Sequence, residues 1–264
     1  MNDIYPIIEN FDDEGIINKK NYIQNINKED LNIDLIKNKN IDSVLFIFDN
    51  EFPEFLNNHT KEFYVFKNGS NINKVYLYED KFLLAFSPLG GPAAGGLMEE
   101  LGFLGMKNFF ACGSAGQIDH SIDSKKFVLV DKAIRDEGTS YHYLKPSIYV
   151  ESDNELTNAL ASFLDKSDFD YIKSATWTTD AFFRETPKAV NQRIKQGAVC
   201  VEMECASWCA IAKFRKYKFA QLLYFSDAVK QEAWQWNIDK KELKNNIIKL
   251  MINFMLNFTK QSAF

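Results

Sequence analysis

The sequence has few of the residues that usually mark metal, disulfide or redox sites. It contains four cysteines and three histidines in 264 residues. The cysteines are Cys112, Cys200, Cys205 and Cys209, which form no C-x-x-C pair and have no histidine near them in sequence. Zinc sites and redox motifs use such closely spaced ligands. We therefore expect buried, reduced thiols in a cytoplasmic protein and no metal site.

Long apolar runs and an excess of basic charge are also missing. No stretch approaches the roughly 20 apolar residues that a membrane helix needs. The start, MNDIYPIIENFDDEG, has neither the basic residues nor the apolar centre of a signal peptide. A net charge of -5 leaves no basic footprint for nucleic acid. These features predict a soluble, cytoplasmic protein that binds neither membrane nor nucleic acid.

The length and the apolar content of 46% indicate a folded chain with one large core. Residues 1–40 are rich in Asn, Asp, Lys and Ile. They predict short helices or an extended arm, and no function can be read from them. No linker or internal repeat divides residues 41–264, so we expect one domain there.

Short apolar runs alternate with helical patterns through that domain. Runs typical of strands are 43–48, 63–66, 75–78, 82–86, 108–112, 126–130, 171–177, 198–202 and 219–225. The second and third of these flank an Asn-Gly-Ser loop, which predicts a hairpin. Helical spacing covers 93–104, 155–164, 187–196, 205–216 and 240–258, and Asp153 or Ser152 is the expected N-cap of the second of these helices. The alternation predicts an α/β fold, a single-domain three-layer sandwich with helices on both faces of a β-sheet.

Glycine is scarce except in one stretch. Eight of the twelve glycines lie between Gly90 and Gly116. The order of patterns there is strand, glycine turn, helix, strand, glycine turn, with the turns at 90–92 and 113–116. Because ligands bind at the carboxyl ends of strands in open α/β sheets, we expect two backbone-lined openings here. The stretch lacks G-x-G-x-x-G, which argues against a NAD site.

Other expected strand ends also carry polar or functional residues. These are 179–182 (TDAF), 202–204 (EME) and 226–227 (SD). Each is weak alone, because short polar motifs of this kind are usually only turns or helix caps. Together with the two glycine turns, they predict a ligand site at one edge of the sheet.

The order of these motifs resembles the nucleoside phosphorylase superfamily, which includes uridine phosphorylase, hexameric purine nucleoside phosphorylase and methylthioadenosine nucleosidase. The resemblance runs from Val44 to the C-terminus. It is most specific in GGPAAGGLMEELGFLGMKNFFACGSAGQID, TTDAFF, VEMECASWCAIA and YFSDAV. It implies a mixed, twisted sheet between helices and a catalytic domain that cleaves N-glycosidic bonds. It further implies a homo-oligomer, either a dimer or an assembly of dimers, with no cofactor.

The resemblance also assigns roles at the sugar and base. Glu204 matches the glutamate that binds the ribose 2′- and 3′-hydroxyls, and Met203 matches the residue under the sugar; Glu202 belongs to the same motif. Asp227, with Ser226, matches the carboxylate that protonates or hydrogen-bonds N7 of a purine. Uridine phosphorylases lack this aspartate, so a purine-type base is favoured. Phe182 matches the aromatic residue that stacks on the base.

The nucleophile side shows departures from the family pattern. Ser114, with the backbone amides of Gly113 and Ala115, matches the turn that meets phosphate or the attacking water, and Gly91 is expected to line the same cavity. Phosphorylases have an arginine where this chain has Ala111, and a Gly-Asp-Pro loop where it has residues 48–51. Arg135, or failing that Arg184, is expected to supply the missing charge.

Three functions therefore stay open. The first is phosphorolysis of a purine-type nucleoside, in which phosphate is the co-substrate. The second is hydrolysis by an activated water, which Glu202 or an acidic residue of 49–51 would orient. The third is a degenerate relative that binds nucleosides without cleaving them.

Overall fold

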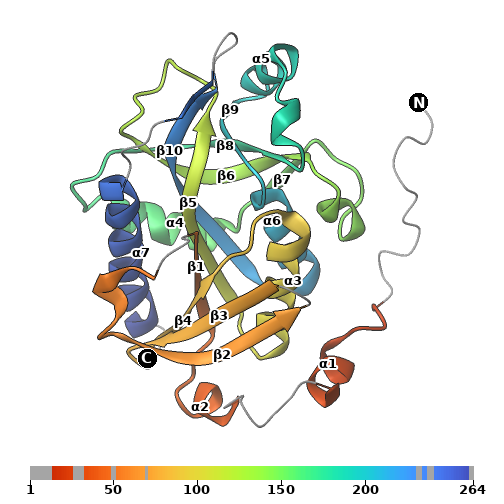
Figure 1. Cartoon of the computed structure of the whole chain (residues 1–264), viewed down its shortest axis with the longest axis vertical. Coiled ribbons are helices and arrows are strands. Elements are labelled where there is room, and N and C mark those ends of the chain that lie inside the picture. Colours follow the sequence, from red (N-terminus) through yellow and green to blue (C-terminus); the bar gives the residue numbers. More distant parts are fainter. Residues whose placement is uncertain are drawn as a thin grey trace.

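The computed structural model describes residues 14–25, 33–48, 52–68, 71–229, 234–236 and 241–261. Within these residues the strands form one mixed, 11-stranded sheet (Figure 1). The strands are β1 (Ser43–Ile47), β2 (Thr60–Asn68), β3 (Asn71–Tyr78), β4 (Phe82–Phe86), β5 (Asn108–Gln117), β6 (Phe127–Asp136), β7 (Tyr149–Glu151), β8 (Tyr171–Thr179), β9 (Ala198–Glu202), β10 (Lys218–Val229) and β11 (Trp234–Trp236).

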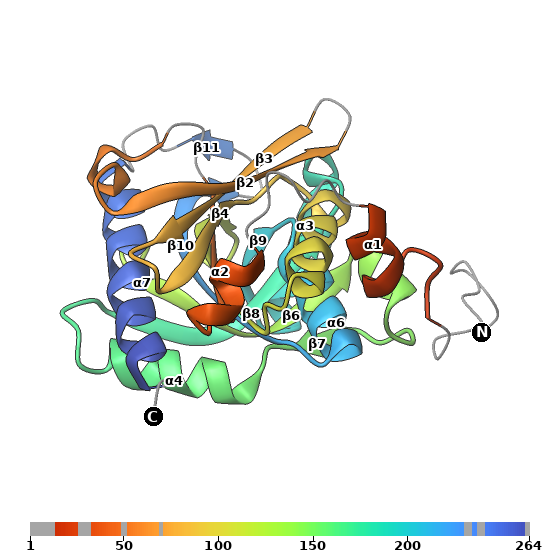
Figure 2. The same cartoon turned by 90° about the horizontal axis from the view of Figure 1, so that it is seen from below.

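Helices cover both faces of this sheet, as predicted. They are α1 (Lys19–Asn25), α2 (Ile33–Asn38), α3 (Gly91–Phe103), α4 (Asn154–Leu164), α5 (Pro187–Lys195), α6 (Cys205–Arg215) and α7 (Lys241–Gln261), with short 3-10 turns η1 (Glu54–Leu56), η2 (Thr139–His142) and η3 (Phe182–Arg184). Figure 2 shows α3 and α6 on one side of the sheet and α4 and α7 on the other. None of the described helices is long and apolar enough to cross a membrane.

Alternating side chains along the central strands build a separate core on each face. Val44 and Phe46 of β1 pack with residues of α3 and α6, whereas Leu45 and Ile47 pack with residues of α4 and α7. The same alternation runs through β5 and β10. A strand covered on both faces needs apolar residues at every position. This burial explains the continuous apolar runs in the sequence.

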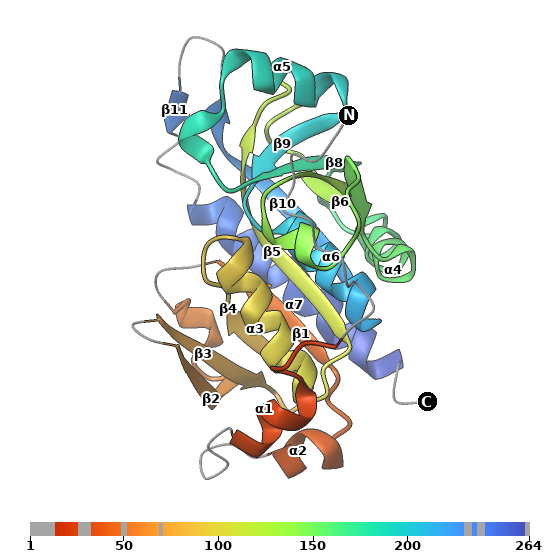
Figure 3. The ribbon, with the colours of Figure 1, turned by 90° about the vertical axis from the view of Figure 1, so that its right-hand side faces the viewer.

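Part of the sheet closes on itself. β5 pairs in parallel with β10 and antiparallel with β9. β10 also pairs antiparallel with β6, and β8 pairs in parallel with both β6 and β9. These pairings join β5, β10, β6, β8 and β9 into a ring, whose upper part lies under α5 in Figure 3. The ring closure brings the ends of β5, β9 and β10 around one opening.

Several local predictions are confirmed. β2 and β3 form the expected hairpin. Asp153 caps α4, where its side chain accepts a hydrogen bond of 2.9 Å from the amide of Leu156. The described part of residues 1–40 contains the short helices α1 and α2.

The prediction of a glycine turn at 113–116 is wrong. β5 continues through these residues, where Gly113 pairs with Leu223 and Gly116 pairs with Val201. A side chain at Gly113 would meet the ring of Phe48, and one at Gly116 would meet Val201. The small residues therefore permit close packing inside a strand that has a partner on each side. Ser114 is consequently held by a sheet and not by a mobile turn.

Candidate active site

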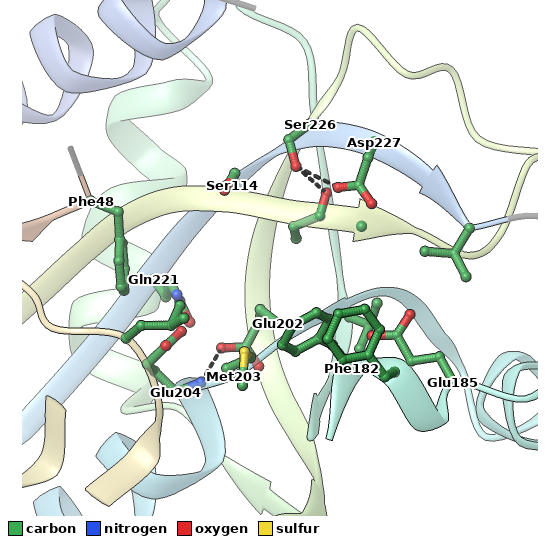
Figure 4. A pocket seen from close by; sticks show the side chains of 16 residues that line it. Phe48, Ser114, Phe182, Glu185, Glu202, Met203, Glu204, Gln221, Ser226 and Asp227 are labelled. Atoms are coloured by element: carbon green, nitrogen blue, oxygen red, sulfur yellow. Dashed lines mark hydrogen bonds between the residues drawn. The ribbon is translucent and has the colours of Figure 1, made fainter. Parts of the chain in front are cut away.

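A pocket of about 600 Å³ opens at the carboxyl ends of several strands (Figure 4). β5, β9 and β10 contribute their last residues, and the segments that follow β1, β4 and β8 complete the wall. The lining residues are Phe48, Leu89, Ser114, Ala115, Gly116, Phe182, Phe183, Glu185, Val201, Glu202, Met203, Glu204, Gln221, Ser226, Asp227 and Val229. This is the sheet edge at which a ligand site was predicted.

Most of the predicted site residues meet in this pocket. They are Ser114, Phe182, Glu202, Met203, Glu204, Ser226 and Asp227. In sequence they are spread over more than a hundred residues, and the ring of strands brings them together. Their roles toward a substrate stay predictions, but their common location is a property of the fold.

Glu204 is fixed at the point where β9 turns into α6. It occupies the N-cap position of α6 and is only 4% exposed. Its Oε1 accepts a hydrogen bond of 2.6 Å from the amide of Gly90. Gly90 has φ +89°, a conformation that favours glycine, and it leads directly into α3. The first glycine turn of the sequence thus serves to hold the Glu204 carboxyl group.

Glu202 holds the start of α6, and with it Glu204, in place through hydrogen bonds. Its Oε2 accepts hydrogen bonds from the amides of Glu204 (2.8 Å) and Cys205 (2.7 Å). Its Oε1 accepts a bond of 2.5 Å from Thr178 Oγ1. These bonds satisfy the free amides at the start of α6. The geometry favours a positioning role for Glu202 over the predicted role of orienting a water molecule.

Burial and a neighbouring acidic group raise the pKa of both carboxyl groups; the neighbour is Glu202 for Glu204, and Glu137 for Glu202. Burial raises the pKa of Glu204 to about 8, and the negative charge of Glu202 adds to the rise, against the hydrogen bonds from backbone amides. Burial also raises the pKa of Glu202, which its three hydrogen-bond donors oppose. Because Glu202 has more donors for its ionised form, Glu204 is the group that holds a proton at neutral pH.

A nucleoside that binds through its hydroxyls is expected to displace about one proton from Glu204 at pH 7. The free carboxyl group is mostly protonated there because its pKa is about 8. Hydroxyl donors favour the ionised form and lower the pKa in the complex, so binding should weaken as the pH falls below 8. Calorimetry in buffers of different ionisation enthalpy measures the proton release. The native protein should release more protons than Glu204→Gln; equal release by both would contradict this coupling.

Another acidic group of residues lies at the opposite end of the pocket. Ser226 Oγ donates a hydrogen bond of 2.6 Å to Asp227 Oδ1. Glu185, which follows η3, lines the same end. Burial raises the pKa of Glu185 to about 7, and the negative charge of Asp227 contributes. Phe182 of η3 is 48% exposed and its ring contacts that of Phe183 at 4.1 Å between centroids. An aromatic ring beside carboxyl groups suits a heterocyclic base.

The wall contributed by β5 has an accessible hydroxyl but no positive charge. Ser114 is the one exposed residue of β5. Ala111 is fully buried in the core beneath α3 and α6. No Lys, Arg or His is found among the described residues that line the pocket. Residues 49–51, one predicted source of an acid, lie outside the described residues.

Arg135 does not line the pocket, contrary to the prediction that it would supply the missing charge there. Its guanidinium is buried and donates to Ser140 Oγ, Ser147 Oγ and the carbonyls of Leu144 and Lys145 at 2.7–3.0 Å. Arginine's five donors are well suited to tie such a loop to its strand. Arg184 is exposed at the end of η3 and does not line the pocket either.

The predicted glycine contacts also differ from the observed ones. Gly91 does not line the pocket; a side chain there would meet Ser207 of α6 and Thr139 of η2. Gly113 lies behind Phe48, so it shapes the wall without lining it. Both glycines are needed for close packing and not for direct contact with a ligand.

Several residues that line the pocket were not predicted. Two of them have a sequence feature that could have identified them. Gln221 is a polar residue inside the apolar run FAQLLYF, and a buried amide in such a run is unusual. Glu185 follows the TTDAFF motif closely. The others carry no such mark; they are Phe48, Leu89, Gly116, Phe183, Val201 and Val229. Ala115, which was predicted beside Ser114, also lines the pocket.

Comparison with solved structures identifies the fold as that of nucleoside phosphorylases. A purine nucleoside phosphorylase from Toxoplasma gondii, solved in complex with immucillin-H, superposes with a TM-score of 0.73 and 16% sequence identity, over 89% of this chain and 95% of the other. A uridine phosphorylase from Vibrio fischeri gives a TM-score of 0.63 and 19% identity, over 82% and 89% of the two chains. At these identities the likeness establishes the fold alone.

Sequence comparison identifies the family to which the chain belongs. A model of the phosphorylase superfamily matches residues 44–253, and the chain belongs to this superfamily. A guanosine phosphorylase of Halorubrum lacusprofundi is 26% identical over 47% of this chain and 52% of its own length. A uridine phosphorylase of Thermococcus kodakarensis is 32% identical over 36% of this chain and 34% of its own length. The chain thus spans about half or less of these curated relatives. The predicted family is confirmed.

Proposed function

We propose that this protein cleaves the N-glycosidic bond of a purine-type nucleoside. The observation that carries the proposal is the gathering of Glu204, Phe182 and Asp227 in one pocket. Glu204 would accept hydrogen bonds from the ribose hydroxyls and lie near the positive charge that develops on the sugar. Phe182 would stack on the base, and Asp227 would assist its departure. Nothing in this reaction needs a metal or an organic cofactor.

The purine preference rests on the acidic end of the pocket. A departing purine gains negative charge that protonation at N7 relieves, so a carboxyl group that carries a proton is required. Asp227 lies there with Glu185, whose raised pKa of about 7 keeps a proton available in this region at neutral pH. The curated relatives include both a guanosine phosphorylase and uridine phosphorylases, so the purine preference rests on these two carboxyl groups and not on the relatives' names.

Phosphate is one of two candidates for the acceptor of the sugar. Several relatives carry the name phosphorylase, and the accessible Ser114 hydroxyl would donate to a phosphate oxygen. Water is the second candidate, because no cation was found among the described lining residues. We further propose that the protein acts in the cytoplasm, as expected from its composition, and as a homo-oligomer, as expected from the family resemblance.

The acceptor is tested by measuring products from a panel of purine nucleosides with and without inorganic phosphate. Phosphorolysis predicts free base and ribose 1-phosphate, with base release that depends on phosphate. Undiminished release of base and free ribose in phosphate-free buffer would contradict phosphorolysis and support hydrolysis. Binding of nucleosides with no release of base in either buffer would indicate a degenerate, non-cleaving relative.

A further inference from the structure

Gln221 is an unsatisfied polar side chain in the pocket wall. It lies in the middle of β10, is only 1% exposed, and lines the pocket. Its Oε1 atom is buried and accepts no hydrogen bond from any described residue. A buried amide oxygen without a donor is costly, and such groups usually mark a place where a bound molecule or water completes the bonding. The pocket is the side from which that molecule would come.

Gln221 lies next to Ala111, the residue at which this chain differs from the family pattern. β10 and β5 are paired in parallel, and Gln221 lies directly opposite Ala111. Ala111 stands where the family resemblance leads one to expect a phosphate-binding arginine. Side chains opposite each other on paired strands share one face of the sheet. On this face the chain therefore presents a neutral amide beside an alanine methyl group, and not a guanidinium.

Gln221 lies at the sugar end of the pocket. Figure 4 shows it between Phe48 and Glu204, whereas Asp227 and Phe182 lie at the other end. A nucleoside with its base at Asp227 and its ribose at Glu204 would bring the sugar close to Gln221. The molecule that attacks C1′ must approach from the sugar side of the glycosidic bond.

The acidic lining of the pocket favours water over phosphate as the acceptor of the sugar. Glu185, Glu202, Glu204 and Asp227 contribute carboxyl groups, and no cationic side chain was found among the described lining residues. A phosphate dianion here would find acidic side chains and no described cationic partner in a partly desolvated site. Water carries no charge and has hydrogens to donate, which is what the unsatisfied Oε1 of Gln221 requires.

We propose that Gln221 binds the attacking water in this pocket, so that hydrolysis is favoured over phosphorolysis; this assignment rests on the proposed cleavage of a nucleoside. Water donates one hydrogen to Oε1 and directs a lone pair at C1′. The oxygen–C1′ bond forms as the C1′–N9 bond breaks, and the bonding pair leaves with the base. The proton from Asp227 goes to N7 of the base, and the proton that water loses passes to a pocket carboxylate. Water is thus added across the bond.

The variant Gln221→Leu tests this role, because leucine has similar size and no hydrogen-bonding group. Base release into water is expected to fall about 10- to 100-fold, the equivalent of one lost hydrogen bond to the nucleophile. The Tm should stay the same or rise, because the substitution removes an unsatisfied buried oxygen. A lower Tm with unchanged cleavage per folded molecule would assign Gln221 to structure alone and overturn the proposal.

The variant Gln221→Lys adds the positive charge that the pocket lacks. With phosphate present, the native protein should form mainly free ribose, and Gln221→Lys should shift the products toward ribose 1-phosphate. The ratio of these products does not depend on how much protein is folded. Gln117→Lys is the matched control, since Gln117 is a buried glutamine of β5 outside the pocket that bonds to the carbonyls of Asp119 and Ile122; its product ratio should stay native. An identical ratio in native protein and Gln221→Lys would overturn the proposal.

A melting experiment with inorganic phosphate tests the same inference without turnover. Phosphate should raise the Tm of Gln221→Lys and leave that of the native protein unchanged. A saturable rise in the native Tm would show that the native pocket binds phosphate, and would overturn the choice of water. Absence of base release from every nucleoside would contradict the proposed function. The melting result would still show whether a pocket with Gln221 binds phosphate.

Discussion

The variant Asp227→Asn is expected to lower kcat for purine nucleosides about 100- to 10,000-fold, the usual range for loss of a general acid. Asn has the size of Asp and retains a carbonyl oxygen that can accept the Ser226 hydrogen bond. It cannot transfer a proton to N7 of the departing base. The substitution therefore removes the proton transfer and preserves the hydrogen bond from Ser226. Initial rates of base release, measured by chromatography at saturating nucleoside, give the effect.

The matched control is Asp165→Asn at the end of α4. Asp165 is exposed, accepts a hydrogen bond from Tyr171 Oη and does not line the pocket. It should retain native activity. Unchanged kcat in Asp227→Asn, with a purine nucleoside as substrate, would refute the leaving-group role of Asp227. Glu185 would then become the stronger candidate for the acid, since its pKa is raised to about 7.

The variant Glu204→Gln is expected to lower kcat/KM about 100- to 1,000-fold. Two hydrogen bonds from ribose hydroxyls to a carboxylate are replaced by weaker ones to a neutral amide, and bonds to charged groups contribute about 1.5–3 kcal/mol each. The glutamine carbonyl can still accept the hydrogen bond from the Gly90 amide, so the start of α3 should keep its position.

Substrate analogues make this prediction specific. The native protein should prefer a ribonucleoside strongly over its 2′,3′-dideoxy analogue, and Glu204→Gln should lose most of that preference. Glu151→Gln is the control, because the Glu151 side chain is 70% exposed and pairs with Lys213 away from the pocket. Retention of the native preference by Glu204→Gln would exclude contact between Glu204 and the sugar hydroxyls.

The gathering of the strand-end motifs could be predicted from sequence. Glu204 and Asp227 follow apolar runs, and the carboxyl ends of strands in an α/β sheet tend to meet at one edge. The family resemblance added the identity of the ligand that such an edge would bind. The same logic placed the helices on both faces, because buried strands need cover on each side.

The errors have causes that become visible only in the folded chain, and the error at 113–116 comes from the closure of the sheet into a ring. Gly113 and Gly116 look like turn residues when read locally, yet their strand continues because β9 and β10 pair with it. Arg135 precedes a polar loop, and the sequence does not show that its guanidinium folds back to bind that loop. Gln221 belongs to no motif. Its proposed role follows from its position opposite Ala111 on the neighbouring strand, which the sequence does not show.

The most direct test of the proposed function is chromatographic detection of free base after incubation of the purified protein with a purine nucleoside. Native protein should release the base catalytically, whether the sugar product is ribose or ribose 1-phosphate, and Asp227→Asn should release it at least about 100-fold more slowly. Absence of free base from the whole panel of purine nucleosides would contradict the proposed cleavage of N-glycosidic bonds.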